Sequence, residues 1–105
     1  MKEITVKELK QLMDDQADFQ LIDVREPYEV EIAEIGAELI PMGTIPSSVE
    51  KIAKNKKVIV HCRSGKRSGD VIQWLETSHG YDNLYNLVGG ILAWSKEIDQ
   101  RIPLY

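Results

Sequence analysis

The stretch Lys57–Gly69, KVIVHCRSGKRSG, decides the fold of this chain. Its first part, Val58–Val60, is short, apolar and β-branched, which favours a buried strand. The apolar run stops before Cys62, and the polar loop Arg63–Arg67 follows. A helix is predicted from Ser68, because apolar residues then recur at helical spacing: Val71, Ile72 and Leu75. The only cysteine of the chain therefore lies where a strand ends and a helix is about to begin.

This position favours a reactive sulfur at Cys62. The first turn of a helix has free N–H groups and the positive end of the helix dipole, and a loop of consecutive amides can curl around an anion. Three cationic side chains, Arg63, Lys66 and Arg67, lie within five residues of the sulfur, and Gly65 allows a tight bend. These features all favour the nucleophilic thiolate, so we predict a lowered pKa. The alternative is an inert, buried cysteine at a strand end.

The loop Cys62–Ser68, CRSGKRS, resembles the active-site loop of the rhodanese sulfurtransferases. Leu21–Pro27, LIDVREP, is similar to the first strand and turn of that family. Tyr85–Trp94, YNLVGGILAW, is similar to its last strand and last helix. The resemblance runs from about Ile4 to about Ile98, and it implies the single-domain rhodanese-like fold.

The length and charge of the chain narrow the choice of function. With 105 residues, 43% of them hydrophobic, the chain is expected to form one domain over 1–105, with its core at about 4–98. The net charge of −4 argues against a general nucleic-acid binder. Positive charge is instead concentrated beside Cys62, which suits a small anion.

The lone cysteine excludes an internal disulfide and a multi-cysteine metal site. His61 and His79 lack ligand spacing, so we interpret His61 as a packing or hydrogen-bonding residue and expect no metal and no organic cofactor. No apolar run follows the N-terminus and none is long enough to span a bilayer, so we expect no signal peptide and no membrane partner. The expected setting is cytoplasmic and reducing.

Strands and helices alternate along the chain. Thr5–Glu8 has the form of a capping box that begins a helix. Phe19–Val24 is a strand candidate interrupted by Asp23. We interpret Asp23 and Arg25 as a scaffold ion pair, with the alternative that Arg25 faces the Cys62 loop and supports the site.

Pro27 fits the first position of a short helix, with the apolar residues Tyr28, Val30, Ile32 and Ile35. The segment Ala33–Ala37 departs from the rhodanese pattern, because Glu34 stands where many relatives carry histidine and no proline follows. This departure concerns the local turn and the rim of the pocket, not the nucleophile.

In the second half of the chain, Ala37–Ile40 is expected to be a short strand and Met42–Pro46 a loop. Ser47–Glu50 reads as a second capping box, for a helix through Ala53. Trp74 is expected in the core, and Leu84–Leu87 forms the last strand. Gly89-Gly90 is either a tight turn or a close contact with the Cys62 loop. The whole pattern predicts an α/β fold: a central parallel sheet of about five strands with helices on both faces.

The resemblance implies a thiosulfate sulfurtransferase in which Cys62 takes the outer sulfur of thiosulfate or of a persulfide donor. The resulting Cys62 persulfide then passes that sulfur to cyanide, a thiol or a protein acceptor. We expect the amides of Arg63–Arg67 to hold the negative charge, and Arg63 and Lys66 to bind the oxygens of the donor. Arg67 either does the same or is solvated, and Ser64 offers a hydroxyl.

Two alternatives remain. The first is a persulfide carrier or regulatory module that serves a partner protein. The second is a cysteine phosphatase, which is disfavoured because those enzymes place five residues between cysteine and arginine and here four intervene between Cys62 and Arg67.

Overall fold

The computed structural model describes residues 1–105 and contains one five-stranded sheet. Its strands are β1 (Lys2–Ile4), β2 (Phe19–Asp23), β3 (Glu38–Leu39), β4 (Lys57–His61) and β5 (Leu84–Leu87). Their order in the sheet is β1-β5-β4-β2-β3, and every neighbouring pair is parallel. The predicted parallel sheet is confirmed, and the strand that leads to Cys62 lies at its centre.

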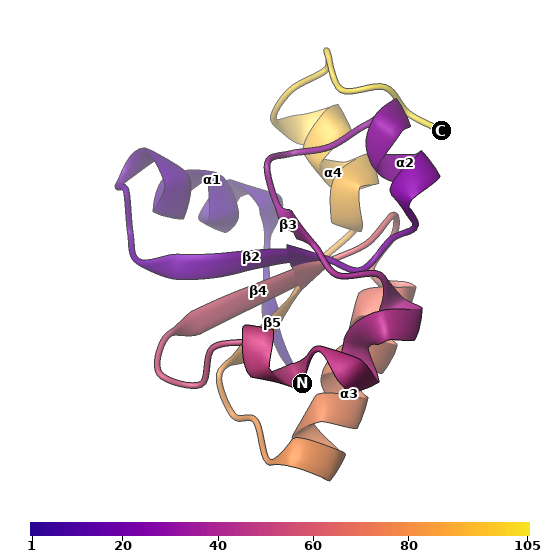
Figure 1. Ribbon diagram of the computed structural model, residues 1–105. Coiled ribbons are helices and arrows are strands. Elements are labelled where there is room, and N and C mark those ends of the chain that lie inside the picture. Colours follow the sequence, from indigo (N-terminus) through magenta and orange to yellow (C-terminus); the bar gives the residue numbers. More distant parts are fainter.

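Helices cover both faces of the sheet, as predicted (Figure 1). The α-helices are α1 (Val6–Asp14), α2 (Pro27–Ile32), α3 (Lys66–His79) and α4 (Gly90–Glu97), and two short 3₁₀ helices are η1 (Met42–Ser47) and η2 (Val49–Lys51). In Figure 1, α1 and α4 lie above the sheet, whereas α3, η1 and η2 lie below it. None of these helices is both long and apolar enough to cross a membrane.

The alternation of side chains along β4 builds two cores. Val58 and Val60 pack with residues of α3, whereas Ile59 packs on the other face with residues of α1 and α4. All three are fully or almost fully buried. A strand that is buried on both faces is continuously apolar, which explains the unbroken run before Cys62.

The ends of α1 and α3 follow their local sequence. At α1 the predicted capping box is confirmed: Glu8 N donates to Thr5 Oγ1 at 3.1 Å, and Thr5 N donates to Glu8 Oε1 at 2.9 Å. The α3 helix begins at Lys66, two residues before the predicted Ser68. Its N-cap residue Gly65 has φ of 107°, a left-handed conformation that glycine adopts without strain.

The prediction of a capped α-helix from Ser47 through Ala53 is wrong. The chain forms the two 3₁₀ helices η1 and η2 there, and the hydroxyl of Ser47, the N-cap residue of the predicted box, donates to the carbonyl of Thr44 inside η1. Pro46 has no N–H to donate, and the segment is too short to sustain an isolated α-helix. The sequence pattern of a capping box therefore does not by itself establish an α-helix.

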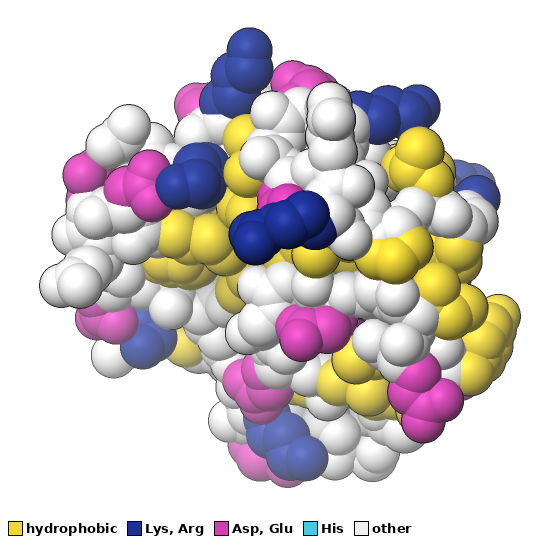
Figure 2. All heavy atoms as spheres, turned by 90° about the horizontal axis from the view of Figure 1, so that it is seen from above, with side chains coloured by type: hydrophobic (Ala, Val, Ile, Leu, Met, Phe, Trp, Pro, Cys, Tyr) yellow, Lys and Arg dark blue, Asp and Glu magenta, His cyan; other side chains and the backbone are white.

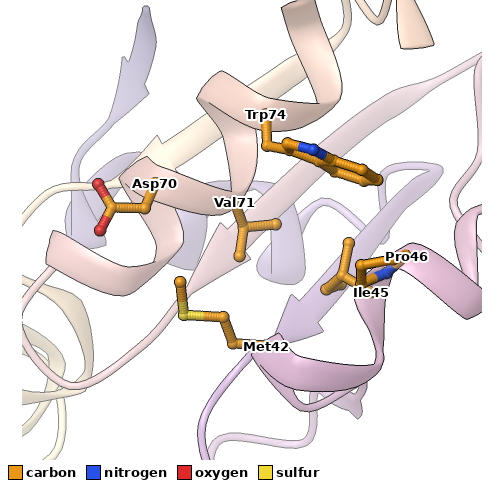
Figure 3. A pocket seen from close by; sticks show the side chains of 6 residues that line it. All are labelled: Met42, Ile45, Pro46, Asp70, Val71 and Trp74. Carbon is orange, nitrogen blue, oxygen red and sulfur yellow. The ribbon is translucent and has the colours of Figure 1, made fainter. Parts of the chain in front are cut away.

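The expectation that Trp74 lies in the core is also wrong, because its side chain is 37% exposed. It borders a hollow of about 250 Å³ between η1 and α3, lined by Met42, Ile45, Pro46, Asp70, Val71 and Trp74. In Figure 3 the apolar side chains converge on this hollow, whereas Asp70 points away from it. None of the lining residues belongs to the Cys62 loop, although one of them, Asp70, pairs with Lys66 of that loop.

Candidate active site

Cys62 directly follows β4, at the end of the sheet where the parallel strands finish. Its residue surface is 1% exposed, and Cys62 is the free cysteine of the chain. The loop then curls back, so that the amide of Gly65 donates to Cys62 Sγ at 3.1 Å. In such sheets the space beyond the strand ends is the usual ligand position. The structure therefore places the sulfur where the sequence predicted it, at the start of α3.

A hydrogen-bonded ring encloses the sulfur, formed by Cys62, Gly65, Ser68 and Asn86. Ser68 Oγ lies 3.3 Å from Cys62 Sγ and 2.6 Å from Asn86 Oδ1. Asn86 Nδ2 donates to the carbonyl of Gly65 at 3.0 Å, and the amide of Gly65 closes the ring at the sulfur. We call these four residues the sulfur ring. It joins the loop and the first turn of α3 to β5, the strand beside β4.

The pKa of the Cys62 thiol lies below its ordinary value. Burial by itself raises the pKa, but hydrogen bonding by Ser68 and by the amides of Gly65 and Ser64 lowers it by more. The direction agrees with the prediction from the sequence. Of the causes that the sequence offered, the amides of the loop contribute, and the Ser68 hydrogen bond adds to them, whereas the loop cations are not among the main causes.

The first turn of α4 holds the backbone of the loop. Ile91 N donates to Cys62 O at 3.0 Å, and Leu92 N donates to Arg63 O at 3.2 Å. Gly90 makes this approach possible, since a Cβ added there would lie 2.4 Å from Arg63 O. The pair Gly89-Gly90 is thus a close contact with the loop as well as a turn.

The three cations of the loop are placed differently. Lys66 has a side chain that is 80% exposed and pairs with Asp70 at 3.1 Å. Arg63 donates to the carbonyl of Tyr105 and lies over the Tyr105 ring, 5.1 Å from its centre. The side chain of Arg67 is 33% exposed and is held by an acidic partner, so Arg67 is not the freely solvated residue of one of its two alternatives.

That partner is Glu29 of α2. Arg67 Nη1 and Nη2 donate to Glu29 Oε1 and Oε2 at 2.7 and 2.9 Å, and the hydroxyl of Tyr105 donates to Oε2 at 2.7 Å. Hydrogen bonding from Arg67 is the main reason that the pKa of Glu29 is lowered to about 2. The short helix α2 therefore buries a carboxylate, whereas the predicted apolar contacts Tyr28 and Ile32 are 64% and 43% exposed.

The expected ion pair between Asp23 and Arg25 is present and buried. Arg25 Nη2 lies 2.7 Å from Asp23 Oδ2, and Arg25 Nε donates to Asp23 Oδ1 at 3.0 Å. Arg25 also donates to Ala33 O at 2.7 Å and to the Tyr105 hydroxyl at 2.7 Å. We call Asp23, Arg25, Glu29, Arg67 and Tyr105 the charged cluster. Arg25 supports the loop through this cluster and does not face the sulfur.

The remaining candidates are peripheral to the sulfur. His61 is fully buried, its Nδ1 lies 3.2 Å from Cys62 O, and burial lowers the pKa of its ring. It therefore packs and hydrogen-bonds as the sequence indicated. Ser64 reaches the sulfur through its amide, and its hydroxyl forms no hydrogen bond within the protein. Glu34 accepts a hydrogen bond from the amide of Gly36.

Positive charge does not spread from the loop into a broad patch on the face that Figure 2 shows. Seen from above, Lys and Arg side chains on this face stand apart from one another among acidic and apolar side chains (Figure 2). Such scattered charges give no continuous basic surface of the kind that tracks a nucleic-acid backbone.

Sequence reasoning missed four residues that shape the site: Ser68, Asn86, Glu29 and Tyr105. The sequence pattern places Ser68 only at the beginning of a helix, although a serine in the first turn has its hydroxyl close to the preceding loop. Asn86 offers a clearer signal, because an amide side chain in a buried strand needs hydrogen-bond partners. Glu29 and Tyr105 are distant from the loop in the sequence, and only the folded chain brings them next to Arg67, so no local pattern indicates their role.

Comparison with known proteins agrees with this fold. The model of the Rhodanese-like domain family matches residues 5–97. A sulfurtransferase of Allochromatium vinosum is 37% identical over 97 residues, which cover 91% of this chain and 90% of that protein. The Rhodanese-like/PpiC domain-containing protein 12 of Arabidopsis thaliana is 42% identical over the whole of this chain, which spans 38% of the plant protein.

A solved structure extends the agreement to three dimensions. A rhodanese-like domain protein from Staphylococcus aureus superposes with a TM-score of 0.84 at 36% identity, covering 100% of this chain and 99% of that one. The family match over residues 5–97 and the superposition over the whole chain lead to one conclusion. This chain belongs to the rhodanese-like domain family.

Proposed function

We propose that this protein is a sulfurtransferase that carries sulfur as a persulfide on Cys62. The observation that carries the proposal is the environment of the sulfur: a buried thiol with a lowered pKa, held at 3.1 Å by the Gly65 amide where β4 ends. A thiolate is the form of cysteine that attacks another sulfur atom. Membership of the rhodanese-like family and its relatives that are named sulfurtransferases support the same chemistry.

The proposed reaction has two steps. The Cys62 thiolate attacks the outer sulfur of thiosulfate, a bond forms between the two sulfur atoms, and sulfite leaves with the electron pair of the broken bond. The product on the protein is a persulfide with one negative charge. An acceptor such as cyanide or a thiolate then attacks the terminal sulfur, and Cys62 leaves as the original thiolate. No net oxidation occurs, so no redox cofactor is needed.

Within this proposal the loop has two separate roles. The amides of Ser64 and Gly65 stabilise the negative sulfur, in the manner of an oxyanion hole. Lys66 extends into solvent at the start of α3 and is free to approach the oxygens of a donor anion. Arg67 is left out of donor binding, because both of its terminal nitrogens are bonded to Glu29.

The intact mass of the protein tests the proposal directly. Incubation with thiosulfate should add one sulfur atom, a reducing agent should remove it, and Cys62→Ala should stay unchanged. If thiosulfate adds nothing but a small-molecule persulfide adds one sulfur, the role of Cys62 holds and thiosulfate is not the donor. If neither compound adds sulfur to a folded protein, the proposal is wrong.

Release of that sulfur separates an enzyme from a carrier. Repeated turnover with thiosulfate and cyanide supports the enzyme, whereas a stable persulfide that free acceptors do not discharge supports the carrier alternative. We disfavour a cysteine phosphatase, because only four residues separate Cys62 from Arg67 and both terminal nitrogens of Arg67 are bonded to Glu29. Hydrolysis of an aryl phosphate that is lost in Cys62→Ala would reverse this view.

A further inference from the structure

The sulfur ring contains one hydroxyl proton and two groups that compete for it. Ser68 Oγ lies between Cys62 Sγ at 3.3 Å and Asn86 Oδ1 at 2.6 Å. A serine hydroxyl has a single hydrogen to donate. All three side chains are buried, with residue exposures of 1% for Cys62, 0% for Ser68 and 8% for Asn86. Water therefore does not readily supply a substitute donor, and the direction of this hydrogen matters.

The orientation of the Asn86 amide decides that direction. Its Nδ2 faces the carbonyl oxygen of Gly65 at 3.0 Å, and a carbonyl can only accept. A flipped amide would bring two carbonyl oxygens together, so Oδ1 must face Ser68. Two oxygens 2.6 Å apart need a hydrogen between them, and Oδ1 has none. Ser68 therefore donates to Asn86, and its oxygen accepts the S–H of Cys62.

This arrangement suits a thiol and not an anionic sulfur. Once Cys62 loses its proton, the sulfur faces a lone pair of Ser68 unless the hydroxyl hydrogen turns toward it. That turn leaves Asn86 Oδ1 without its donor inside the protein, which is costly for a buried acceptor. The stabilisation that the anionic sulfur gains from Ser68 is therefore partly offset by the hydrogen bond that Asn86 Oδ1 loses.

We infer that Asn86 is a positioning residue for Cys62: it holds the Ser68 hydrogen away from the sulfur in the resting thiol, and yields it when the sulfur becomes an anion. Asn86 itself does not touch the sulfur and acts through Ser68. The inference deepens the proposed function, on which its importance for sulfur transfer rests, because both the thiolate and the persulfide are anions.

The surroundings leave the hydroxyl as the moving part. Asn86 is closely confined, since a Cβ at Gly69 would lie 3.3 Å from its Nδ2 and one at Gly65 would lie 3.9 Å away. Rotation of one hydroxyl requires no displacement of heavy atoms. Rotation of the hydroxyl does not change the pairing of the charged or titratable groups nearby. These groups are Arg63, Lys66 with Asp70, Arg67 with Glu29, and the buried His61.

Two substitutions and their combination test the inference. Asn86→Leu removes the competitor for the Ser68 hydrogen, so the hydroxyl can point at the sulfur throughout. We expect the ionisation constant of Cys62 to rise by about tenfold, so that the midpoint of its alkylation moves to lower pH. A tenfold change corresponds to one hydrogen bond gained by the anion. The rate of alkylation by iodoacetamide as a function of pH measures it. In a Ser68→Ala background the same Asn86 change should have almost no effect.

Asn83 provides a matched control. Its Nδ2 also donates to backbone carbonyls, those of Ala53 at 2.9 Å and Lys56 at 2.6 Å, but it precedes β5 and does not contact the sulfur ring. Asn83→Leu should lower stability and leave the alkylation midpoint in place. The inference is overturned if Asn86→Leu raises the midpoint, or if it shifts the midpoint equally with and without Ser68.

A measurement on Asn86 in the original protein tests the inference even if the Asn86→Leu variant does not fold. The side-chain amide signals of Asn86 in a nitrogen–proton NMR spectrum should change with the same midpoint as Cys62 alkylation, and Ser68→Ala should remove most of that change. If the signals do not respond to ionisation of Cys62 in the original protein, the inference is wrong. Neither experiment uses a sulfur donor, so its result is independent of whether sulfur transfer occurs.

Discussion

Two buried polar groups flank the same loop and differ in kind. The sulfur ring is uncharged, apart from the sulfur itself, and it contacts Cys62 through Gly65 and Ser68. The charged cluster holds two acids and two arginines, and it connects β2, α2 and the C-terminal segment to Arg67. The sulfur ring contacts the Cys62 sulfur directly, whereas the charged cluster reaches the loop through Arg67.

The difference indicates how the loop divides its work. A buried charge needs a fixed partner, so the charged cluster is well suited to hold backbone segments in place. A hydroxyl with a choice of acceptors can follow a change of charge on the sulfur, which a rigid ion pair cannot. We therefore expect changes in the charged cluster to affect stability, and changes in the sulfur ring to affect the ionisation of Cys62.

The largest effect is expected from Arg25→Met. This change leaves Asp23 buried without its partner, which should lower the free energy of unfolding by about 3–5 kcal/mol. Urea unfolding measures the loss. Arg101→Met is the control, because Arg101 also pairs with an aspartate two residues earlier but has a side chain that is 91% exposed. Equal losses in the two variants would contradict the assignment of Arg25 to a buried scaffold.

Glu29→Gln should change how stability depends on pH. The folded pKa of Glu29, about 2, is below its unfolded value of about 4.5, so its charge stabilises the fold above pH 4.5. That stabilisation, roughly 3 kcal/mol, is lost as the pH falls from about 4.5 to about 2.

The measurement is the difference in unfolding free energy between the original protein and Glu29→Gln across this range. The difference should shrink toward acid, while the alkylation midpoint of Cys62 at neutral pH stays nearly constant. A difference that does not depend on pH would mean that the Glu29 charge contributes nothing through Arg67.

Gly90→Ala should disturb the contact between the first turn of α4 and the backbone of the Cys62 loop. An alanine at φ of 58° costs about 1–2 kcal/mol, and its Cβ would also meet Arg63 O at 2.4 Å. We expect a loss of about 2 kcal/mol in thermal or urea unfolding, together with a shift in the ionisation of Cys62. Gly43→Ala is the control, because a Cβ there meets nothing within 4 Å. An unchanged Cys62 midpoint would show that the loop tolerates displacement from α4.

Lys66→Ala should have the smallest effect on the fold. Its pair with Asp70 is exposed, so stability should change by less than about 0.5 kcal/mol. If Lys66 binds the donor, KM for thiosulfate should rise by up to about fivefold with little change in kcat, and the effect should fade in salt. Lys54→Ala, another exposed lysine away from the loop, should leave KM unchanged. A fall in kcat at constant KM would place Lys66 at the reacting sulfur instead.

The sequence alone determined the architecture and the position of the sulfur. Apolar, β-branched runs such as Val58–Val60 favour a strand that is buried on both faces of a sheet, Gly65 marks a turn, and Thr5 marks the start of a helix. These are short-range patterns, in which a residue and its neighbours in the chain contain the needed information. The cationic loop around Cys62 indicated a lowered pKa on the same local grounds.

Only the tertiary structure decided what each polar side chain does. Arg67 is five residues from Cys62 in the chain, yet it turns to Glu29, which lies 38 residues away. Ser68 reaches Asn86 across 18 residues, and Tyr105 joins Arg25 across 80. A long side chain on a loop has several partners within its reach, and burial selects among them because an unpaired charge or hydroxyl is costly inside the fold. That selection depends on where distant segments pack, which the local sequence does not contain.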